Sequence, residues 1–236
     1  MSSSLEKTGE GPAALIANVR SLLAHDLKNP LSAAWTVTEL MRELDDGTDP
    51  LVSRNIEIVQ SAASRAISWI EDVALTIELE TGQRTVERKA TTVQRVVASA
   101  LEGPFRAEDV ARLTLPPPEP MAVEADPYLL SRGLHALITN GLLHGGKRGT
   151  VEVEAHRDGD GLVFQVLDQG DGVPEERRER LFLPLSSERR AQDRIGGIGL
   201  AVTRACVEVH GGSVGYEPRD SGGSLFWLRI PDPERE

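Results

Sequence analysis

The sequence predicts an α+β protein in two parts, a hairpin of two long helices and then an α/β sandwich. From Pro12 to Leu44 apolar residues recur every three or four positions, which is the period of an amphipathic helix. The same period returns from Ile56 to Ile77. After Gly82 the pattern changes to short strand-like runs separated by shorter helical segments. We therefore expect a flexible segment at 1–11, the helical domain at 12–82, the α/β domain at 83–232 and a short tail at 233–236.

The two helices of the first domain are predicted to form a hairpin. The first ends in the turn-rich segment 45–50, DDGTDP. The second carries apolar residues at alternating steps of three and four, as in a coiled-coil seam. Two helices bury too little surface alone, so we expect two copies of the hairpin to form a four-helix bundle in a homodimer. The residues of the seam are Ile56, Val59, Ala63, Ala66, Ile70, Val73 and Ile77.

The second domain is predicted to alternate strands and helices. We expect strands at 85–89, 111–115, 151–156, 162–167, 213–217 and 225–230, and helices at 92–101, 127–143, 175–182 and 199–209. Asp126 is the expected N-cap of the second of these helices, with Pro127 at its first position. The turn at 157–161, RDGDG, contains glycines that supply positive φ between two strands.

Composition excludes several classes of protein. The 236 residues include 26 basic and 37 acidic side chains, a net charge of −11, which argues against binding to nucleic acid or to an anionic membrane surface. One cysteine forms no internal disulfide, and the five histidines match no common zinc motif. The apolar stretches are shorter than the roughly 18 residues that span a bilayer, and no signal segment opens the chain. We expect a cytoplasmic protein that does not insert into membranes.

His25 is the candidate nucleophile of the first domain. On a helical wheel measured from Leu15 it lies at about 280°, outside the apolar half, with Asn29 beside it and Asp26 at the margin of the apolar stripe. A neutral imidazole is nucleophilic near pH 7, and a carboxylate can fix its tautomer or accept its proton. The trio therefore suits phosphoryl acceptance, although the trio by itself favours a solvated histidine without a role.

The surrounding string, AHDLKNPL at residues 24–31, resembles the phosphoacceptor box of sensor histidine kinases. Three later segments resemble the nucleotide-binding boxes of the same family, in the same order. The segment at 137–145, LITNGLLHG, is similar to the N box, which implies that Asn140 ligates Mg²⁺ and that His144 lies near the phosphates. Taken alone, the segment favours a different interpretation, in which Asn140 is a buried helical asparagine with structural hydrogen bonds.

The other two boxes lie later in the second domain. In DQGDGVP at 168–174, Asp168 can accept a hydrogen bond from an adenine amino group, while Gly170 and Gly172 let the backbone approach the ring. By itself this is also an ordinary tight turn. The third box, GGIGLAV at 196–202, opens a helix whose N–H groups can hold phosphate oxygens. Its candidate residues are Gly196, Gly197, Gly199 and Leu200, and Arg194 precedes them in an arginine-bearing lid that can also be plain surface charge.

The resemblance implies a two-component histidine kinase. ATP with Mg²⁺ would phosphorylate His25, Asp26 would assist, and the phosphoryl group would pass to an aspartate of a response regulator receiver domain. Asn29 would serve a phosphatase reaction on that regulator. A separate sensor or an upstream receiver protein would supply the signal. The alternative is a phosphotransfer and docking module that relays phosphoryl groups between receivers with little use of ATP.

Three departures from the family pattern predict weak ATP binding. Leu143 stands where relatives place a basic residue, Ile195 replaces the first glycine of the glycine-rich box, and Ala136 replaces a usual asparagine. Loss of a phosphate-facing charge weakens triphosphate binding more than adenosine binding.

Overall fold

The computed structural model describes residues 28–45, 47, 49–102, 105, 107–117, 120–146, 149–159, 161–183 and 198–232. The chain divides into two compact units, Met1–Ile77 and Glu78–Glu236, which we call the hairpin unit and the α/β unit. The domain boundary expected from sequence, between 82 and 83, falls a few residues inside the α/β unit. None of the described helices is both long and apolar enough to cross a membrane.

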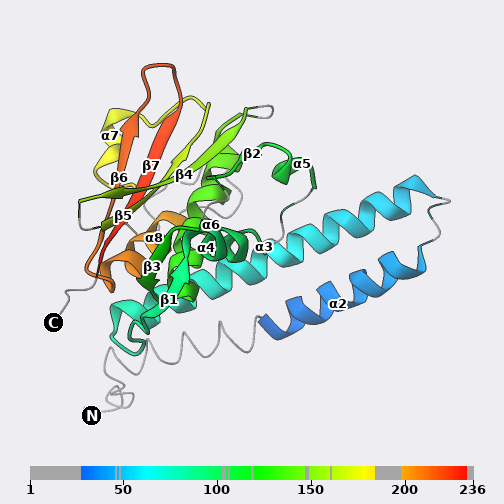
Figure 1. The fold of residues 1–236 in the computed structure, drawn as a ribbon. Coiled ribbons are helices and arrows are strands. Elements are labelled where there is room, and N and C mark those ends of the chain that lie inside the picture. The colour runs from blue at the N-terminus through cyan, green and yellow to red at the C-terminus, as the bar shows by residue number, and fades with distance from the viewer. Residues whose placement is uncertain are drawn as a thin grey trace, which may run out of the picture. The chain divides into compact units, whose positions relative to one another are not determined.

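The hairpin unit contains two antiparallel helices, α2 (Lys28–Leu44) and α3 (Pro50–Glu80) (Figure 1). Asp49 fixes the start of α3, since its carboxylate accepts a hydrogen bond from the N–H of Leu51 at 2.9 Å and Pro50 occupies the first helical position. An ion pair between Lys28 Nζ and Glu71 Oε1, at 2.6 Å, joins the two helices. The described residues of this unit thus form two helices, as predicted.

The α/β unit is built on a five-stranded sheet in the order β2-β4-β5-β7-β6. Its strands are β2 (Leu113–Thr114), β4 (Val151–Asp158), β5 (Gly161–Leu167), β6 (Ser213–Pro218) and β7 (Ser224–Pro231). Only the β2–β4 pair is parallel. A separate antiparallel ribbon joins β1 (Lys89–Thr92) to β3 (Ala122–Ala125).

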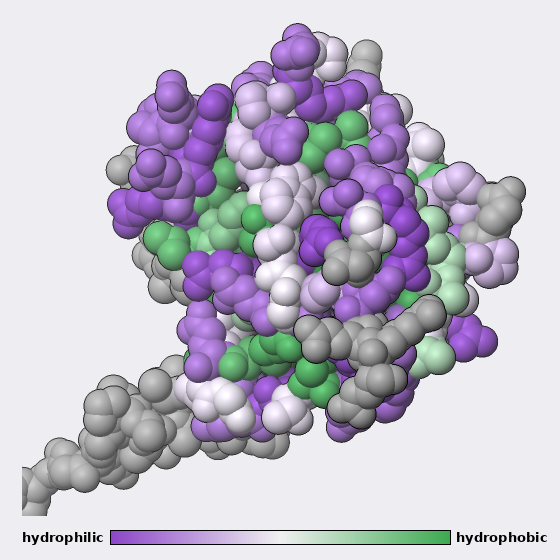
Figure 2. All heavy atoms as spheres, turned by 60° about the vertical axis from the view of Figure 1, so that its left-hand side comes forward, coloured by the Kyte–Doolittle hydropathy of each residue, from purple (hydrophilic) through white to green (hydrophobic). Residues whose placement is uncertain are grey.

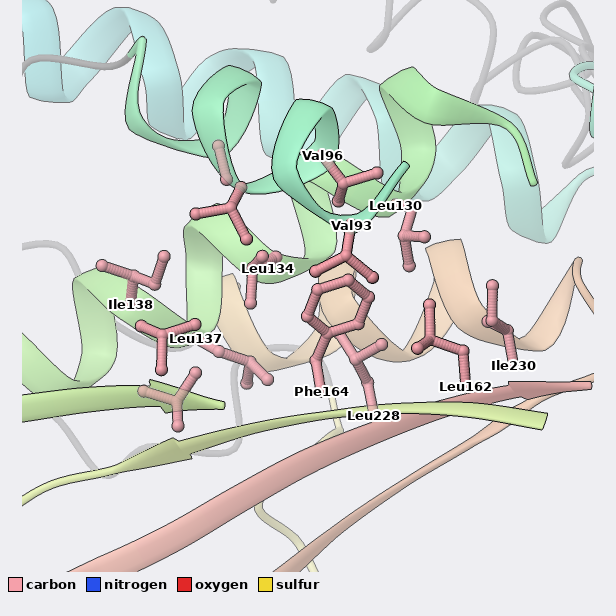
Figure 3. Close-up of a cluster of buried hydrophobic side chains, with 14 of the residues drawn as sticks. Val93, Val96, Leu130, Leu134, Leu137, Ile138, Leu162, Phe164, Leu228 and Ile230 are labelled. Carbon is pink, nitrogen blue, oxygen red and sulfur yellow. The ribbon is translucent and has the colours of Figure 1, made fainter. Parts of the chain in front are cut away.

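Three helices, α4 (Val93–Leu101), α6 (Pro127–His144) and α8 (Gly199–Glu208), cover one face of the sheet, and α5 (Ala107–Val110) and α7 (Glu175–Arg178) are single turns (Figure 1). Their apolar faces meet the buried side of the strands. Figure 3 shows Val93 and Leu134 from the helices opposite Phe164 and Leu228 from the sheet, and all four are buried. Strand β7 alternates buried and half-buried residues, as expected for a sheet covered on one face.

The surface of the protein is more hydrophilic than this buried core (Figure 2). On the face of the molecule drawn in Figure 2, hydrophilic side chains predominate and hydrophobic ones form small separate patches. The described residues of that face therefore offer no broad apolar area.

The α+β class predicted from the sequence is confirmed.

Several predicted elements differ in extent. The strand expected at 85–89 is instead β1 at Lys89–Thr92, which pairs with β3, a strand that the sequence pattern did not predict. The helix expected at 175–182 is the single turn α7, and the strand expected at 111–115 is the two-residue β2. The turn α5 was not expected either. Pairing between segments about thirty residues apart decides the bounds of β1 and β3, and local propensity does not contain that information.

Candidate functional site

Asp168, directly after β5, is the centre of the candidate site. Its side chain is buried, at 1% exposure. Oδ1 accepts hydrogen bonds from the N–H of Gly170 at 2.8 Å and of Ser224 at 3.2 Å. Oδ2 is also buried but has no hydrogen-bond partner among the described residues. A buried acceptor left unpaired costs about 1–3 kcal/mol, so an external donor such as an amino group fits this atom.

Glycines let the loop after Asp168 lie close to its neighbours. A Cβ on Gly170 would lie 2.1 Å from the carbonyl oxygen of His144, which excludes any side chain there. Gly172 has a φ of 73°, a conformation that other residues rarely adopt. The loop is held further on by the Tyr216 hydroxyl, which accepts a hydrogen bond from the N–H of Val173 at 3.0 Å. The loop geometry is therefore set by the backbone and by glycine.

Helix α6 carries Asn140 and packs against α8. The carboxylate of Asp126 caps α6 by accepting from the N–H groups of Tyr128 and Leu129, each at 3.1 Å, as the sequence predicted. Ala136, one turn before Asn140 on the same face, lies 3.8 Å from the place of a Cβ on Gly199. Asn140 is half-buried, and within the described residues its amide makes no hydrogen bond.

The start of α8 offers backbone donors. The helix begins at Gly199, and its N-cap residue, Ile198, supplies no side-chain hydrogen bond. The hydroxyl of Thr203 donates to the carbonyl of Gly133 at 3.1 Å, which ties α8 to α6. The first N–H groups of a helix lack partners within the helix and carry its positive end, so this terminus suits a phosphate group.

The remaining predicted residues are placed as follows. His144 ends α6 with an exposed side chain, and Leu200 is half-buried against the core. Asn29 is exposed near the start of α2. Leu143, one turn after Asn140, is 66% exposed. The predictions for His25, Asp26, Arg194, Ile195, Gly196 and Gly197 lie outside the described residues, and all the predicted site roles stay predictions.

The described residues include one predicted metal ligand but no group of several metal-binding side chains. Within the ranges that the structure describes, no group of three or more His, Cys, Asp or Glu side chains is arranged to hold a metal ion. Mg²⁺ in phosphate sites keeps several waters and uses one or two protein oxygens together with substrate phosphates. Asn140 is the residue predicted to supply such an oxygen, and this role stays a prediction.

Two other histidines are structural. The ring of His135 contacts the carbonyl of Ala100 through Nδ1 at 2.8 Å. His210 donates from Nδ1 to the carbonyl of Cys206 at 2.7 Å and accepts the N–H of Asp126 at Nε2, at 3.0 Å. Burial lowers the pKa of both rings. Neither is accessible as a phosphoryl acceptor.

The sequence interpretation missed three residues that shape this site. Tyr216 holds the loop, Arg219 donates to the carbonyl of Asp168 at 2.8 Å, and Arg112 contacts the end of α6. Each comes from an element distant in sequence and lies in no motif. No local signal could have identified them.

The fold and the site define a class of ATPase domain. Residues 125–234 match the family described as histidine kinase-, DNA gyrase B-, and HSP90-like ATPase. This range includes α6, the Asp168 loop and α8. This part of the chain is therefore similar to the ATPase domains of that family.

The relatives narrow the class, because the chain is homologous to sensor histidine kinases along most of its length. It is 28% identical over 222 residues to the sensor protein KdpD of Escherichia coli, which covers 91% of this chain and 24% of KdpD. It is 28% identical over 234 residues to the histidine protein kinase DivJ of Caulobacter vibrioides, covering 96% of this chain and 38% of DivJ. The chain thus spans about a quarter to two fifths of the length of these relatives.

Solved structures share the fold. Full-length ShkA, crystallised with AMPPNP, superposes with a TM-score of 0.64 at 21% identity, covering 91% of this chain and 46% of ShkA. The histidine kinase AdeS of Acinetobacter baumannii gives 0.60 at 20% identity, covering 89% of this chain and 98% of AdeS. At this identity the likeness establishes the fold alone.

Proposed function

We propose that the chain is a two-component histidine kinase, which transfers the γ-phosphoryl group of ATP to its own His25 and then to an aspartate of a response regulator. The observation that carries the proposal is the unpaired, buried Oδ2 of Asp168. It lies in a domain of the histidine kinase-, gyrase- and Hsp90-like ATPase family, next to a helix that bears a candidate metal ligand.

Asp168, the start of α8 and Asn140 each have a role in the proposed nucleotide binding. Asp168 Oδ2 accepts a hydrogen bond from the adenine amino group, which the carboxylate selects over a carbonyl at that ring position. The N–H groups at the start of α8 hold phosphate oxygens. Asn140 holds Mg²⁺, which when bound neutralises charge on the phosphates. Catalysis by this chain is then mainly positioning and charge neutralisation, as in other phosphoryl transfers.

The phosphoryl group would be transferred in two steps. Nitrogen of the His25 imidazole attacks the γ-phosphorus, a P–N bond forms, the bond to the bridging oxygen breaks, and ADP leaves with that oxygen. Asp26 accepts the imidazole proton or holds the reactive tautomer. In the second step an aspartate oxygen of the regulator replaces the histidine nitrogen on phosphorus, which restores His25.

Dimerisation through the hairpin belongs to the same proposal. Large apolar side chains are exposed along α2 and α3, and a second hairpin would cover them in a four-helix bundle. Among them are Val37, Leu40, Met41, Leu44, Leu51, Val52, Ile58 and Val59.

Incubation with γ-labelled ATP and Mg²⁺ tests the kinase directly. The unmodified protein should acquire acid-labile, base-stable label, and His25→Gln should acquire none. His156→Gln, which alters an exposed histidine on β4, is the matched control and should label normally. Label that persists in His25→Gln, or that maps to His144, would contradict the assignment.

A relay function is the second candidate, and Leu143 favours it. This exposed side chain sits one turn from Asn140, where a basic residue would add phosphate affinity. The unmodified protein should then bind ATP with little preference over ADP, label slowly and accept phosphoryl groups from a phosphorylated receiver. Leu143→Lys should raise ATP affinity several-fold and speed labelling. Tight, ATP-selective binding and brisk labelling without the substitution would leave the kinase function alone.

Asn29 carries the proposed phosphatase reaction. It is exposed near the start of α2, four residues after His25, where its amide can orient a water towards a phospho-aspartate. Asn29→Ala should lose dephosphorylation of the regulator while His25 still labels. Equal loss of both activities would make Asn29 part of the acceptor site or a structural residue.

A further inference from the structure

Arg112 lies between α5 and β2, outside every motif of the sequence. Its guanidinium donates three hydrogen bonds to backbone carbonyls. Nε reaches Gly149 at 2.9 Å, and the two terminal nitrogens reach Leu142 at 3.3 Å and Gly146 at 2.7 Å. Its own carbonyl accepts the N–H of Val151 at 2.9 Å, so its backbone is fixed to the start of β4. Arg112 is therefore anchored at one end and binds three acceptors at the other.

The three acceptors lie at the end of α6 and in the described residues that follow it, within 142–146 and at Gly149. The last carbonyls of a helix have no partner within the helix and carry its negative end. A planar guanidinium supplies several donors in a fixed geometry and a positive charge at the same place. Arg112 thus stabilises the end of the helix that carries Asn140 and sets the path of the chain beyond it.

This segment packs directly on the Asp168 loop. A Cβ on Gly145 would lie 3.0 Å from the Asp168 Cβ, and a Cβ on Gly149 would lie 3.3 Å from the Gln169 Cβ. The side chain of Gln169 also donates to the hydroxyl of Thr150 at 2.8 Å. A shift of the segment would consequently move the backbone that aims Asp168.

We propose that Arg112 is a positioning residue for the adenine subsite: by holding residues 142–146 and Gly149 against the Asp168 loop, it aims the free carboxylate oxygen at the adenine amino group. The proposal rests on nucleotide binding at this site, as inferred above. Arg112 acts through the backbone and not through the phosphates, so its loss should affect adenosine and ADP to the same degree.

The test uses Arg112→Lys in the full chain, which keeps the charge but removes the fork. Dissociation constants for ADP and adenosine are measured by competition with a fluorescent nucleotide analogue. Both should weaken roughly tenfold, the effect of losing one well-aimed hydrogen bond to a charged group. A loss confined to ADP would place the effect at the phosphates and overturn the proposal.

Arg88→Lys is the matched control. Arg88 also donates to three carbonyls, those of Glu124, His210 and Pro231. It lies near the capped start of α6, about 25 Å from the end of that helix by the rise per residue. It should lower the melting temperature while nucleotide affinity stays within about twofold. An equal loss of affinity in Arg88→Lys would show general loosening of the unit and overturn the proposal.

Hydrogen exchange of the unmodified protein gives a second measurement that needs no variant. Bound adenosine should slow amide hydrogen exchange at residues 145–146 and 149–150 as well as at 168–170. These residues pack against each other. Protection at 168–170 alone would overturn the role of Arg112. If the unmodified protein binds neither ADP nor adenosine, the proposed function itself fails. Normal binding by both the unmodified protein and Arg112→Lys would refute only the positioning role.

Discussion

The α/β unit and the hairpin unit treat their apolar side chains in opposite ways. In the α/β unit Phe164, Leu134 and Leu228 are fully buried between the helices and the sheet (Figure 3). In the described part of the hairpin unit Leu44 is 75% exposed and Leu51 is 69% exposed. Burial of apolar surface contributes about 25 cal/mol per Å², so the exposed side chains leave stabilisation unrealised. The described α/β unit thus has a closed core, whereas the described helices of the hairpin unit leave apolar side chains exposed, which fits the proposed bundle.

Buried polar groups sharpen the contrast inside the α/β unit. His210, Asp126 and Thr203 all have hydrogen-bond partners in the core. The free Oδ2 of Asp168 is a departure from this rule at the one loop where a ligand donor is expected. The unpaired Oδ2 of Asp168 thus lies at the proposed nucleotide site of one unit, and exposed apolar side chains lie along the proposed association surface of the other.

The largest expected effect is on the core of the α/β unit. Phe164→Ala should destabilise this unit by about 3–5 kcal/mol, because it leaves a large cavity in a closed core. Urea denaturation followed by tryptophan fluorescence measures the change. Leu115→Ala, at an exposed position beside β2, is the control and should cost under about 1 kcal/mol. Similar losses in the free energy of unfolding for the two variants would contradict the difference between a buried core position and an exposed one.

Next in size is the loss of adenine recognition. Asp168→Asn replaces an acceptor by an amide that can present its donor to the amino group, so ATP should bind about ten- to a hundredfold more weakly. Titration calorimetry measures the dissociation constant. Asp171→Asn makes the same charge change at an exposed position of the same loop and should have little effect. An unchanged affinity in Asp168→Asn would remove this residue from the site.

A charge on the exposed seam tests the hairpin. Val59 belongs to the predicted seam yet is 47% exposed. Val59→Lys should weaken a homodimer at least about tenfold, since it would bury a charge between apolar helices. Glu57→Lys introduces the same residue on the other side of α3 as a control. Sedimentation velocity should then find dissociation of the Val59 variant alone, and a monomeric unmodified protein would disprove the bundle.

The smallest effect is a dependence on pH. Burial lowers the folded-state pKa of His135 and His210 below the ordinary value of 6.5. Below pH 6.5 the unfolded chain binds protons that the folded chain does not, so stability should fall as pH decreases towards the folded pKa values. Denaturation at several pH values measures the slope. His210→Gln should reduce the slope, whereas an equal slope in this variant would assign the dependence to other groups.

The sequence by itself determined the periodic and capped elements. Helix α6 follows its expected Asp126 cap, and β4 and β5 meet at the predicted glycine-containing turn, because side-chain capping and positive φ at glycine act over a few residues. The resemblance to histidine kinases, drawn from ordered boxes, is confirmed by the relatives. These features depend on neighbouring residues, which a sequence displays directly.

The tertiary structure alone decided the rest. The pairing of β1 with β3 requires segments about thirty residues apart, and the expected strand at 85–89 was wrong for that reason. The burial of Asp168 with one free oxygen appears only when Gly170 and Ser224 converge on the other. The contact of Arg112 with the end of α6 likewise joins residues about thirty positions apart. Such long-range meetings depend on packing of the whole unit, so no local pattern in the chain encodes them.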